Sequence, residues 1–274
     1  MVSSDVQRLE QQLVRLLADY PSSTAGWLHQ QCRAARSCTV QGVYHELRKL
    51  QKRGVVVKVG DCYSLSLSWA FEFVQFADRI YDNYVASASH LEILPEHNSS
   101  KTWHFSNLLR LDDLWVQAMV AIFTCSDAKE KFGWNPHPWF YFAQIEKVAQ
   151  YYRLFKQRGW RYYSTIGGDT FLDRHYAESM DASFFEYRTG QAPVFDDMSR
   201  YYALIGDYII TVKLDAATTG RIEELFRSIR CLADADYQSV SRVLNSRGTL
   251  SLKLEHNPQK VKKYVRKFKE FFGV

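Results

Sequence analysis

The sequence lacks long apolar stretches. No run approaches the roughly 18–20 residues of a membrane-spanning helix, and the first residues, MVSSDVQRLEQQ, lack the apolar core of a signal peptide. We therefore expect a cytoplasmic chain with no membrane partner. Apolar residues at 46% and charged residues at 24% are ordinary globular values, which excludes a disordered chain. The 17 Phe, 17 Tyr and 7 Trp supply material for a sizeable core.

The five cysteines form no recognisable metal or redox site. They are scattered between residues 32 and 231, no two form a CxxC pair, and no Cys/His cluster has zinc-ligand spacing. We predict small buried residues in a reducing compartment, and we expect neither a metal nor another cofactor.

Positive charge is present, but it is unevenly distributed. Residues 1–68 carry nine Lys/Arg and five Asp/Glu, a net charge of +4, and residues 251–274 carry seven and two, a net charge of +5. The segment between them carries 19 and 23, a net charge of −4. Such asymmetry is typical of a segment that faces nucleic acid, joined to a part with another role.

Residues 1–68 have the pattern of three helices and a hairpin. Helical spacing of apolar residues predicts helices over 5–18 and 24–35. A third helix begins near Thr39 and ends at Gly54. A period of two on either side of Gly60-Asp61 then predicts a hairpin. The predicted buried stripe of the third helix consists of Val40, Val43, Tyr44, Leu47 and Leu50.

The end of this segment, HELRKLQKRGVVVKVGDCYSL, resembles winged-helix transcription regulators, and the likeness covers residues 5–67. In that fold the exposed face of the third helix lies in the DNA major groove, so the resemblance implies double-stranded DNA as a partner. The alternative is a solvated face, or one that contacts protein or RNA. The residues predicted to contact DNA are Thr39, Gln41, Gly42, His45, Lys49, Lys52 and Lys58.

Residues 69–102 are predicted to form an amphipathic helix and a linker. The helix covers 69–88, and the polar sequence at 99–102 is interpreted as a loop before the next domain. The apolar side of the helix either pairs with a second copy or packs on the C-terminal domain, and the pattern does not decide between them. The residues predicted at a homodimer interface are Phe73, Phe76, Ile80 and Tyr84.

Residues 103–274 alternate between helical and extended patterns, which is typical of an α/β sandwich with a mixed sheet. The predicted helices cover 112–124, 145–157, 171–180, 221–232 and the segment from Pro258 onward. The predicted strands cover 138–142, 160–166, 182–188, 201–205, 208–214 and 249–255.

This succession of elements, with GGD at 167–169 and YYALIGDYIITVKLD before a helix, looks like a phospholipase-D-like domain. The whole chain is similar in layout to TrmB-type regulators, in which a winged helix precedes such a domain. The resemblance implies a domain that senses a small-molecule or protein effector without lipase activity. Active phosphodiesterases of this type need HxK followed four residues later by Asp, and none of the eight histidines here has Lys two residues further on. We therefore expect no catalytic residues, and a chain that is not an enzyme.

Three residues are candidates for an effector pocket. His137 stands between two prolines, and Asp169 and Asp173 follow a predicted strand. Residues at strand ends gather at one edge of an α/β sheet, so these side chains are predicted to lie together. The alternative is a turn histidine with two helix-capping aspartates.

The last predicted helix carries six Lys/Arg around an apolar stripe. Its exposed side is interpreted either as a solvated surface or as a second contact to a DNA backbone or an acidic partner. Its cations are Lys260, Lys262, Lys263, Arg266, Lys267 and Lys269.

These patterns together predict a dimeric DNA-binding transcription regulator of mixed α+β and α/β class. Its predicted domains are a winged helix-turn-helix at 1–68, a connector at 69–102 and an effector-sensing or dimerisation domain at 103–274. A protein-binding adaptor and a divergent nuclease are the alternative hypotheses.

Overall fold

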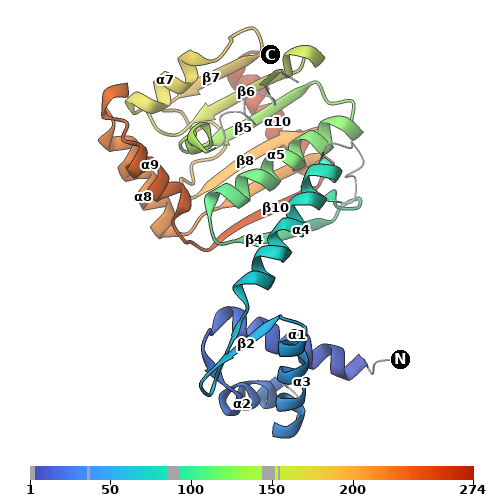
Figure 1. Ribbon diagram of the computed structural model, residues 1–274. Coiled ribbons are helices and arrows are strands. Elements are labelled where there is room, and N and C mark those ends of the chain that lie inside the picture. The colour runs from blue at the N-terminus through green and yellow to red at the C-terminus, as the bar shows by residue number, and fades with distance from the viewer. Residues whose placement is uncertain (1–3, 36–37, 86–92, 144–151, 154) are drawn as a thin grey trace. The chain divides into compact units, whose positions relative to one another are not determined.

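The computed structural model of the chain describes residues 4–35, 38–85, 93–143, 152–153 and 155–274 (Figure 1). Its internal contacts divide the chain into two compact units, Met1–Ala86 and Ser87–Val274. Within these described ranges, no helix is both long enough and apolar enough to cross a membrane.

The N-terminal unit is a winged helix-turn-helix that continues into a long helix. Strand β3 pairs with both β1 and β2, so the wing is a three-stranded antiparallel sheet. Val59 pairs with Cys62 across the two-residue turn Gly60-Asp61, and Gly60 has a φ of +58°, which a glycine adopts without strain. The elements are α1 (Ser4–Asp19), β1 (Ser23–Thr24), α2 (Ala25–Ala35), α3 (Val40–Lys52), β2 (Val56–Val59), β3 (Cys62–Leu65) and α4 (Leu67–Val85).

The C-terminal unit is built on a seven-stranded mixed sheet of order β4-β10-β9-β8-β5-β6-β7. Strands β5, β6 and β7 are parallel, and the other neighbouring pairs are antiparallel. The strands are β4 (Ser100–Phe105), β5 (Glu130–Asn135), β6 (Arg161–Ile166), β7 (Phe185–Thr189), β8 (Arg200–Ile205), β9 (Tyr208–Lys213) and β10 (Leu250–His256). The helices are α5 (Leu108–Cys125), α7 (Phe171–Ser179), α8 (Ala216–Ser228), α9 (Tyr237–Asn245) and α10 (Pro258–Phe272), with short 3-10 helices at Trp139–Phe142 and Leu232–Asp234.

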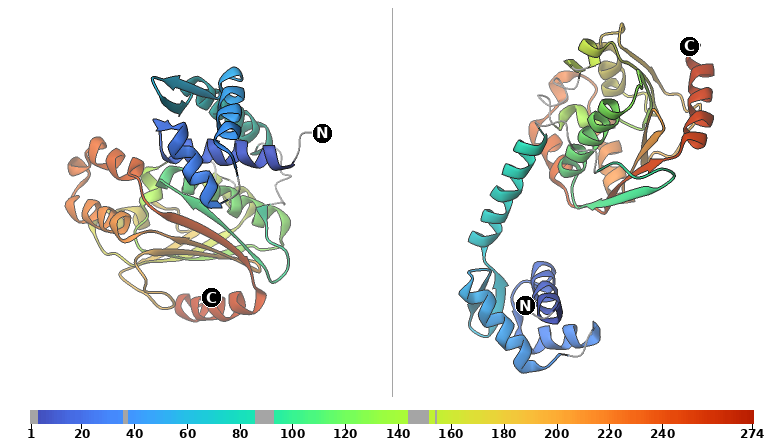
Figure 2. Two further views of the ribbon diagram at one scale, coloured as in Figure 1. Left: turned by 90° about the horizontal axis from the view of Figure 1, so that it is seen from below. Right: turned by 90° about the vertical axis from the view of Figure 1, so that its right-hand side faces the viewer.

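The two faces of this sheet are covered differently. Helices α5, α7, α8 and α9 lie on one face, where the larger apolar core includes Ile122, Phe226 and Leu252. Among the described helices, α10 covers the other face, where Phe268 packs near Phe132 (Figure 2). The expected fold class, a winged helix, a connector helix and a C-terminal α/β unit with a mixed sheet, is confirmed.

Several local predictions for the C-terminal unit were wrong. The segment predicted as a strand at 138–142 forms a 3-10 helix, because Pro136 and Pro138 withhold two backbone donors from any ladder. The adjacent β5 was missed. The polar residues at 99–102, interpreted as a loop, largely belong to β4, an edge strand that tolerates polar side chains because its first residues are exposed. Helix α9 was also missed. The predicted helix at 145–157 lies mostly outside the described residues.

The cysteines also differ from their prediction. Cys32 is fully buried, whereas Cys125 and Cys231 are exposed. A small side chain can stand at the end of a helix or in a surface turn without a packing partner, so burial is not a property of the residue type alone.

Candidate functional site

The outer side of α3 presents one continuous polar stripe. Val43, Leu47 and Leu50 are fully buried and define the inner side of the helix. At about 100° per residue, four side chains point in the opposite direction, and all four are exposed. We call them the α3 outward stripe: Gln41, His45, Arg48 and Lys52.

This orientation differs from the predicted one by part of a turn. Val40 and Tyr44, predicted in the buried stripe, are 40% and 39% exposed, and Glu46 is buried instead. Arg48 was therefore missed as an outward cation. Centring the helix on Val43, Leu47 and Leu50 would have identified it from the sequence.

The other residues predicted to contact DNA lie around this stripe. Thr39 is exposed and caps α3, because its hydroxyl accepts a hydrogen bond from the Gly42 backbone N–H at 3.1 Å. Gly42 is half-buried. Lys49 stands beside the stripe, and its ammonium is 2.9 Å from a carboxylate oxygen of the buried Glu46. Lys58 is exposed on β2, with its ammonium 5.6 Å from the Tyr63 ring centre.

Helix α4 exposes large apolar side chains on two sides. Phe73, Phe76 and Ile80, predicted at a dimer interface, are 60%, 53% and 42% exposed and share one side by their helical spacing. Tyr84 belongs to α4, but its side chain lies outside the described part. Leu67, Phe71 and Val74 are also exposed and lie on the opposite side of the same helix. A helix that is apolar on two sides is suited to contact two partners.

In the C-terminal unit, His137 and Asp173 lie together. Both were predicted to line an effector pocket. His137 follows β5, and its Nδ1 is 2.9 Å from Oδ1 of Asp173, the third residue of α7. On the other side of the ring, Nε2 is 3.2 Å from Oε1 of Glu223 on α8. Glu223 was missed, since no local pattern connects residue 223 to residue 137. The imidazole is only 3% exposed, and its Nε2 has no hydrogen-bond partner among the described residues, because the approach of Glu223 is an ion-pair contact only.

Asp169 does not join this cluster. Its side chain is 58% exposed and lies 3.1 Å from the Arg174 guanidinium. Gly168 is the residue that holds the cluster closed, because a Cβ at this position would collide with the Asp173 carboxylate and the His137 ring. The GGD sequence is thus explained by close packing at the carboxyl edge of β5 and β6.

A second buried polar group lies on the α5 side of the sheet. Lys131 is 3% exposed, and its ammonium is 3.8 Å from the Tyr162 ring centre. Burial lowers the pKa of Lys131 to about 7. Lys131, Tyr162 and Asn135 line a small cavity of about 30 Å³, enough for one or two water molecules. The Asn135 amide nitrogen donates to Tyr162 and Ser164, while its carbonyl oxygen has no hydrogen-bond partner within the described structure.

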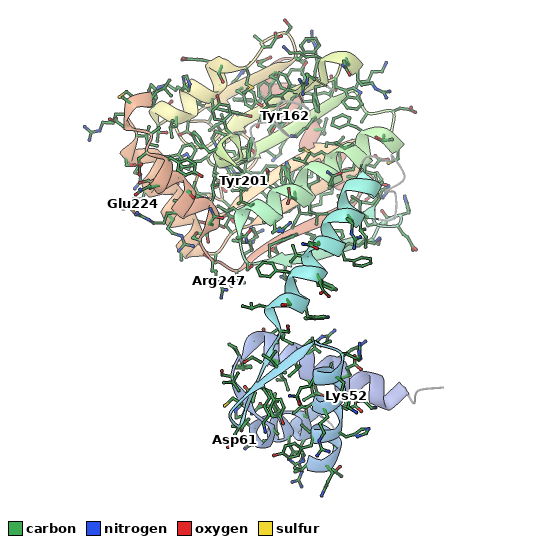
Figure 3. All side chains as sticks on the ribbon, viewed as in Figure 1. Lys52, Asp61, Tyr162, Tyr201, Glu224 and Arg247 are labelled. Atoms are coloured by element: carbon green, nitrogen blue, oxygen red, sulfur yellow. The ribbon has the colours of Figure 1, made fainter. Side chains whose placement is uncertain are left out.

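The side-chain view places these sites in separate units (Figure 3). Lys52 and Asp61 are on the winged helix, whereas Tyr162 and Tyr201 belong to the sheet of the C-terminal unit. Burial raises the pKa of Tyr201 well above its ordinary value, which keeps this phenol neutral beside His137. Across the described ranges, no cluster of three or more His, Cys, Asp or Glu side chains is arranged to hold a metal ion.

Comparison with known proteins finds similar structures but no related sequence. No protein-family model matches the chain, and no curated protein matches it. TrmBL2, an archaeal chromatin protein with a novel mode of DNA binding, is 11% identical with a TM-score of 0.34, over 97% of this chain and 92% of TrmBL2. NucT from Helicobacter pylori is also 11% identical with a TM-score of 0.34, over 64% of this chain and 97% of NucT. Polyphosphate kinase from Porphyromonas gingivalis is 13% identical with a TM-score of 0.38, over 68% of this chain and 29% of the kinase.

One prediction is corrected by these comparisons. The expectation that the chain is not an enzyme is contradicted by the match to NucT over 64% of this chain. Nuclease activity stays among the alternative hypotheses for the chain.

Proposed function

We propose that the chain is a DNA-binding transcription regulator whose α3 outward stripe contacts double-stranded DNA. The observation that carries this proposal is the stripe itself, four exposed side chains in line on the third helix of a winged helix-turn-helix. Gln41 and His45 have donors and acceptors that suit base edges. Arg48 can bind a guanine or a phosphate through two N–H groups, and Lys52 suits a phosphate.

The regulator is proposed to act as a homodimer in the cytoplasm. A winged helix with a net charge of +4 makes few phosphate contacts, and two copies double that number. The exposed apolar residues of α4, Phe73, Phe76 and Ile80, supply a surface for the pairing. The C-terminal unit is proposed to bind a small-molecule or protein effector.

The test is the affinity of the full chain for its own promoter DNA, measured by fluorescence anisotropy at several salt concentrations. Replacing both cations of the stripe, R48Q with K52Q, should weaken binding and lower the slope of log K against log salt by about two, because two phosphate contacts are lost. The control R15Q with R79Q removes the same charge from exposed positions on α1 and α4. Equal affinity and slope for the stripe variant and the wild type would exclude α3 as the DNA-binding helix.

Assays on the same promoter DNA distinguish the proposed function from the two alternatives. Strand cleavage that depends on added protein, followed on a denaturing gel with and without a divalent cation, would support the nuclease alternative. Failure to bind any DNA, together with selective capture of a protein by the α3 stripe, would support the adaptor alternative.

A further inference from the structure

Helix α10 is divided into an apolar side, which is covered, and a basic side, which faces outward. Val261, Phe268 and Phe272 are buried against the sheet residues Phe132 and Leu204. The C-terminal end of α10 is held in place by Arg188, whose guanidinium donates to the Phe271 and Phe272 carbonyls at 2.7 and 3.3 Å. The basic side is therefore presented by a helix with a fixed position on its unit.

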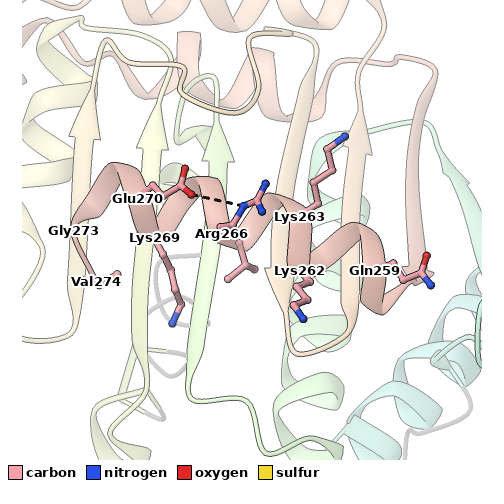
Figure 4. Close-up of a pocket in the computed structure, with 9 residues that line it drawn as sticks. Gln259, Lys262, Lys263, Arg266, Lys269, Glu270, Gly273 and Val274 are labelled. Atoms are coloured by element: carbon pink, nitrogen blue, oxygen red, sulfur yellow. Dashed lines mark ion pairs between the residues drawn. The ribbon is translucent and has the colours of Figure 1, made fainter.

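The outward side of α10 carries cations in excess of its local anions. The helix has six Lys/Arg and one acidic residue, Glu270. Lys269 is 2.7 Å from Glu130, and Lys260 is 3.2 Å from Glu255. Arg266 is 3.7 Å from Glu270, the pair marked by a dashed line in Figure 4. Three exposed ammonium groups have no ion pair with any described residue: Lys262, Lys263 and Lys267.

The neighbouring strands extend this basic surface. Ile209 of β9 packs toward α10, so Lys213, four residues further along the same strand, points to the same face. Lys213 is exposed and is paired in register with Arg200 of β8, whose guanidinium is 3.0 Å from the Asp197 carboxylate. Lys213 is therefore the cation that this strand pair adds to the surface.

The arrangement is unfavourable for the isolated fold. Lys262 and Arg266 are four residues apart on the helix, and so are Lys263 and Lys267, and like charges at this spacing destabilise a helix. A row of anions lying along the helix would remove this repulsion. The aromatic side chains Phe268 and Phe272 of α10 are covered by the sheet, and Val274 is the exposed apolar residue at its end, so this side offers little apolar surface for insertion into lipid.

We propose that the basic side of α10 is a second nucleic-acid contact, which binds the phosphate backbone of double-stranded DNA without reading its sequence. Flexible lysines without bidentate partners suit phosphate oxygens and carry no base preference. The inference rests on the proposed function in one respect, that DNA is the partner of this chain.

The test compares full-length variants on a duplex of random sequence. The variant K262Q/K263Q/K267Q should bind this duplex at least tenfold more weakly at low salt and lower the salt slope by about two to three. The matched control R230Q/R242Q/R247Q removes the same charge from exposed positions on the α8–α9 side, where Arg247 is seen in Figure 3. Thermal melting followed by circular dichroism checks that both variants fold like the wild type.

The outcomes distinguish this inference from the proposed function. If only R48Q with K52Q loses DNA affinity, and the α10 variant binds DNA like its control, the inference is overturned and the proposed function stands. A loss confined to the α10 variant would support the inference and overturn recognition by α3. If neither variant changes DNA affinity, both are wrong. Binding to phosphatidylserine vesicles that only the α10 variant loses, with DNA affinity unchanged, would assign the surface to a membrane instead.

Discussion

Lys131 carries an ammonium group that is removed from water in the folded protein. An ammonium between aromatic rings, 3.8 Å from the centre of Tyr162 and 6.0 Å from that of Trp115, gains some cation–π attraction but loses its hydration. Loss of hydration dominates, and the pKa of Lys131 falls to about 7. In the folded chain Lys131 therefore releases its proton near pH 7, whereas in the unfolded chain it keeps the proton up to a pH of about 10.4.

Stability should consequently rise with pH through this range. Between pH 7 and 9 the unfolded chain binds the proton that native Lys131 has released, so the free energy of unfolding increases by up to about 1.4 kcal/mol per pH unit from this group. Below pH 7 both states are protonated and the contribution is constant. Replacing Lys131 by Met should remove this part of the slope, as measured by urea unfolding at pH 7, 8 and 9. Identical slopes for the wild type and K131M would contradict the low pKa.

At the scale of elements, the turns after β5, β6 and β7 form one interlocked structure. The Gly168 backbone N–H donates to the Pro136 carbonyl at 2.9 Å, and the Gly190 N–H donates to the Gly168 carbonyl at 3.1 Å. Thr170 caps α7 through a reciprocal pair of hydrogen bonds with Asp173, which in turn holds His137. The three turns therefore depend on each other's positions.

A methyl group at Gly168 should disturb all of them. G168A is expected to lower the free energy of unfolding by about 1–3 kcal/mol, because a Cβ overlaps buried groups that cannot move outward. G220A is the matched control, since the same change within α8 meets no atom and removes a helix-destabilising glycine, which should raise stability by about 0.5–1 kcal/mol. Chemical denaturation measures both changes. Equal stability of G168A and the wild type would show that the turn is not packed as described.

At the scale of the whole molecule, α4 is the element through which we expect the chain to assemble. Its two apolar sides, one with Phe73 and Phe76 and the other with Phe71 and Val74, remain exposed in the described chain. Several large apolar side chains exposed on two sides of one helix are typical of an interaction site rather than of a solvated helix. Pairing through one side leaves the other for a second contact, so the two predicted roles of the connector are compatible.

The proposed dimer assigns the first side to the second copy. F73S with F76S should therefore shift the chain from dimer toward monomer by at least tenfold in dissociation constant, as measured by sedimentation equilibrium. F71S with V74S changes the opposite side and should leave the dimer intact. The reverse result would place the interface on the Phe71 side, and a wild type that stays monomeric at all concentrations would exclude the dimer.

The sequence by itself determined those features that depend on neighbouring residues. The winged helix was predicted in order because apolar spacing and a Gly-Asp turn are local signals. The strands at 201–205 and 208–214, which pair across Gly206-Asp207, were also predicted from local patterns. The start of α10 was predicted from Pro258, and the preceding residue caps the helix, because the side-chain Oδ1 of Asn257 accepts from the Lys260 N–H at 3.0 Å.

Only the tertiary structure decided features that join distant parts of the chain. It brings Glu223 to His137 and buries Lys131 in β5. It also sets the rotation of α3, which exposes Tyr44, buries Glu46 and places Arg48 on the outer side. The reason is that burial depends on what packs from the other side of an element, and a periodic pattern records the apolar residues but not their partners.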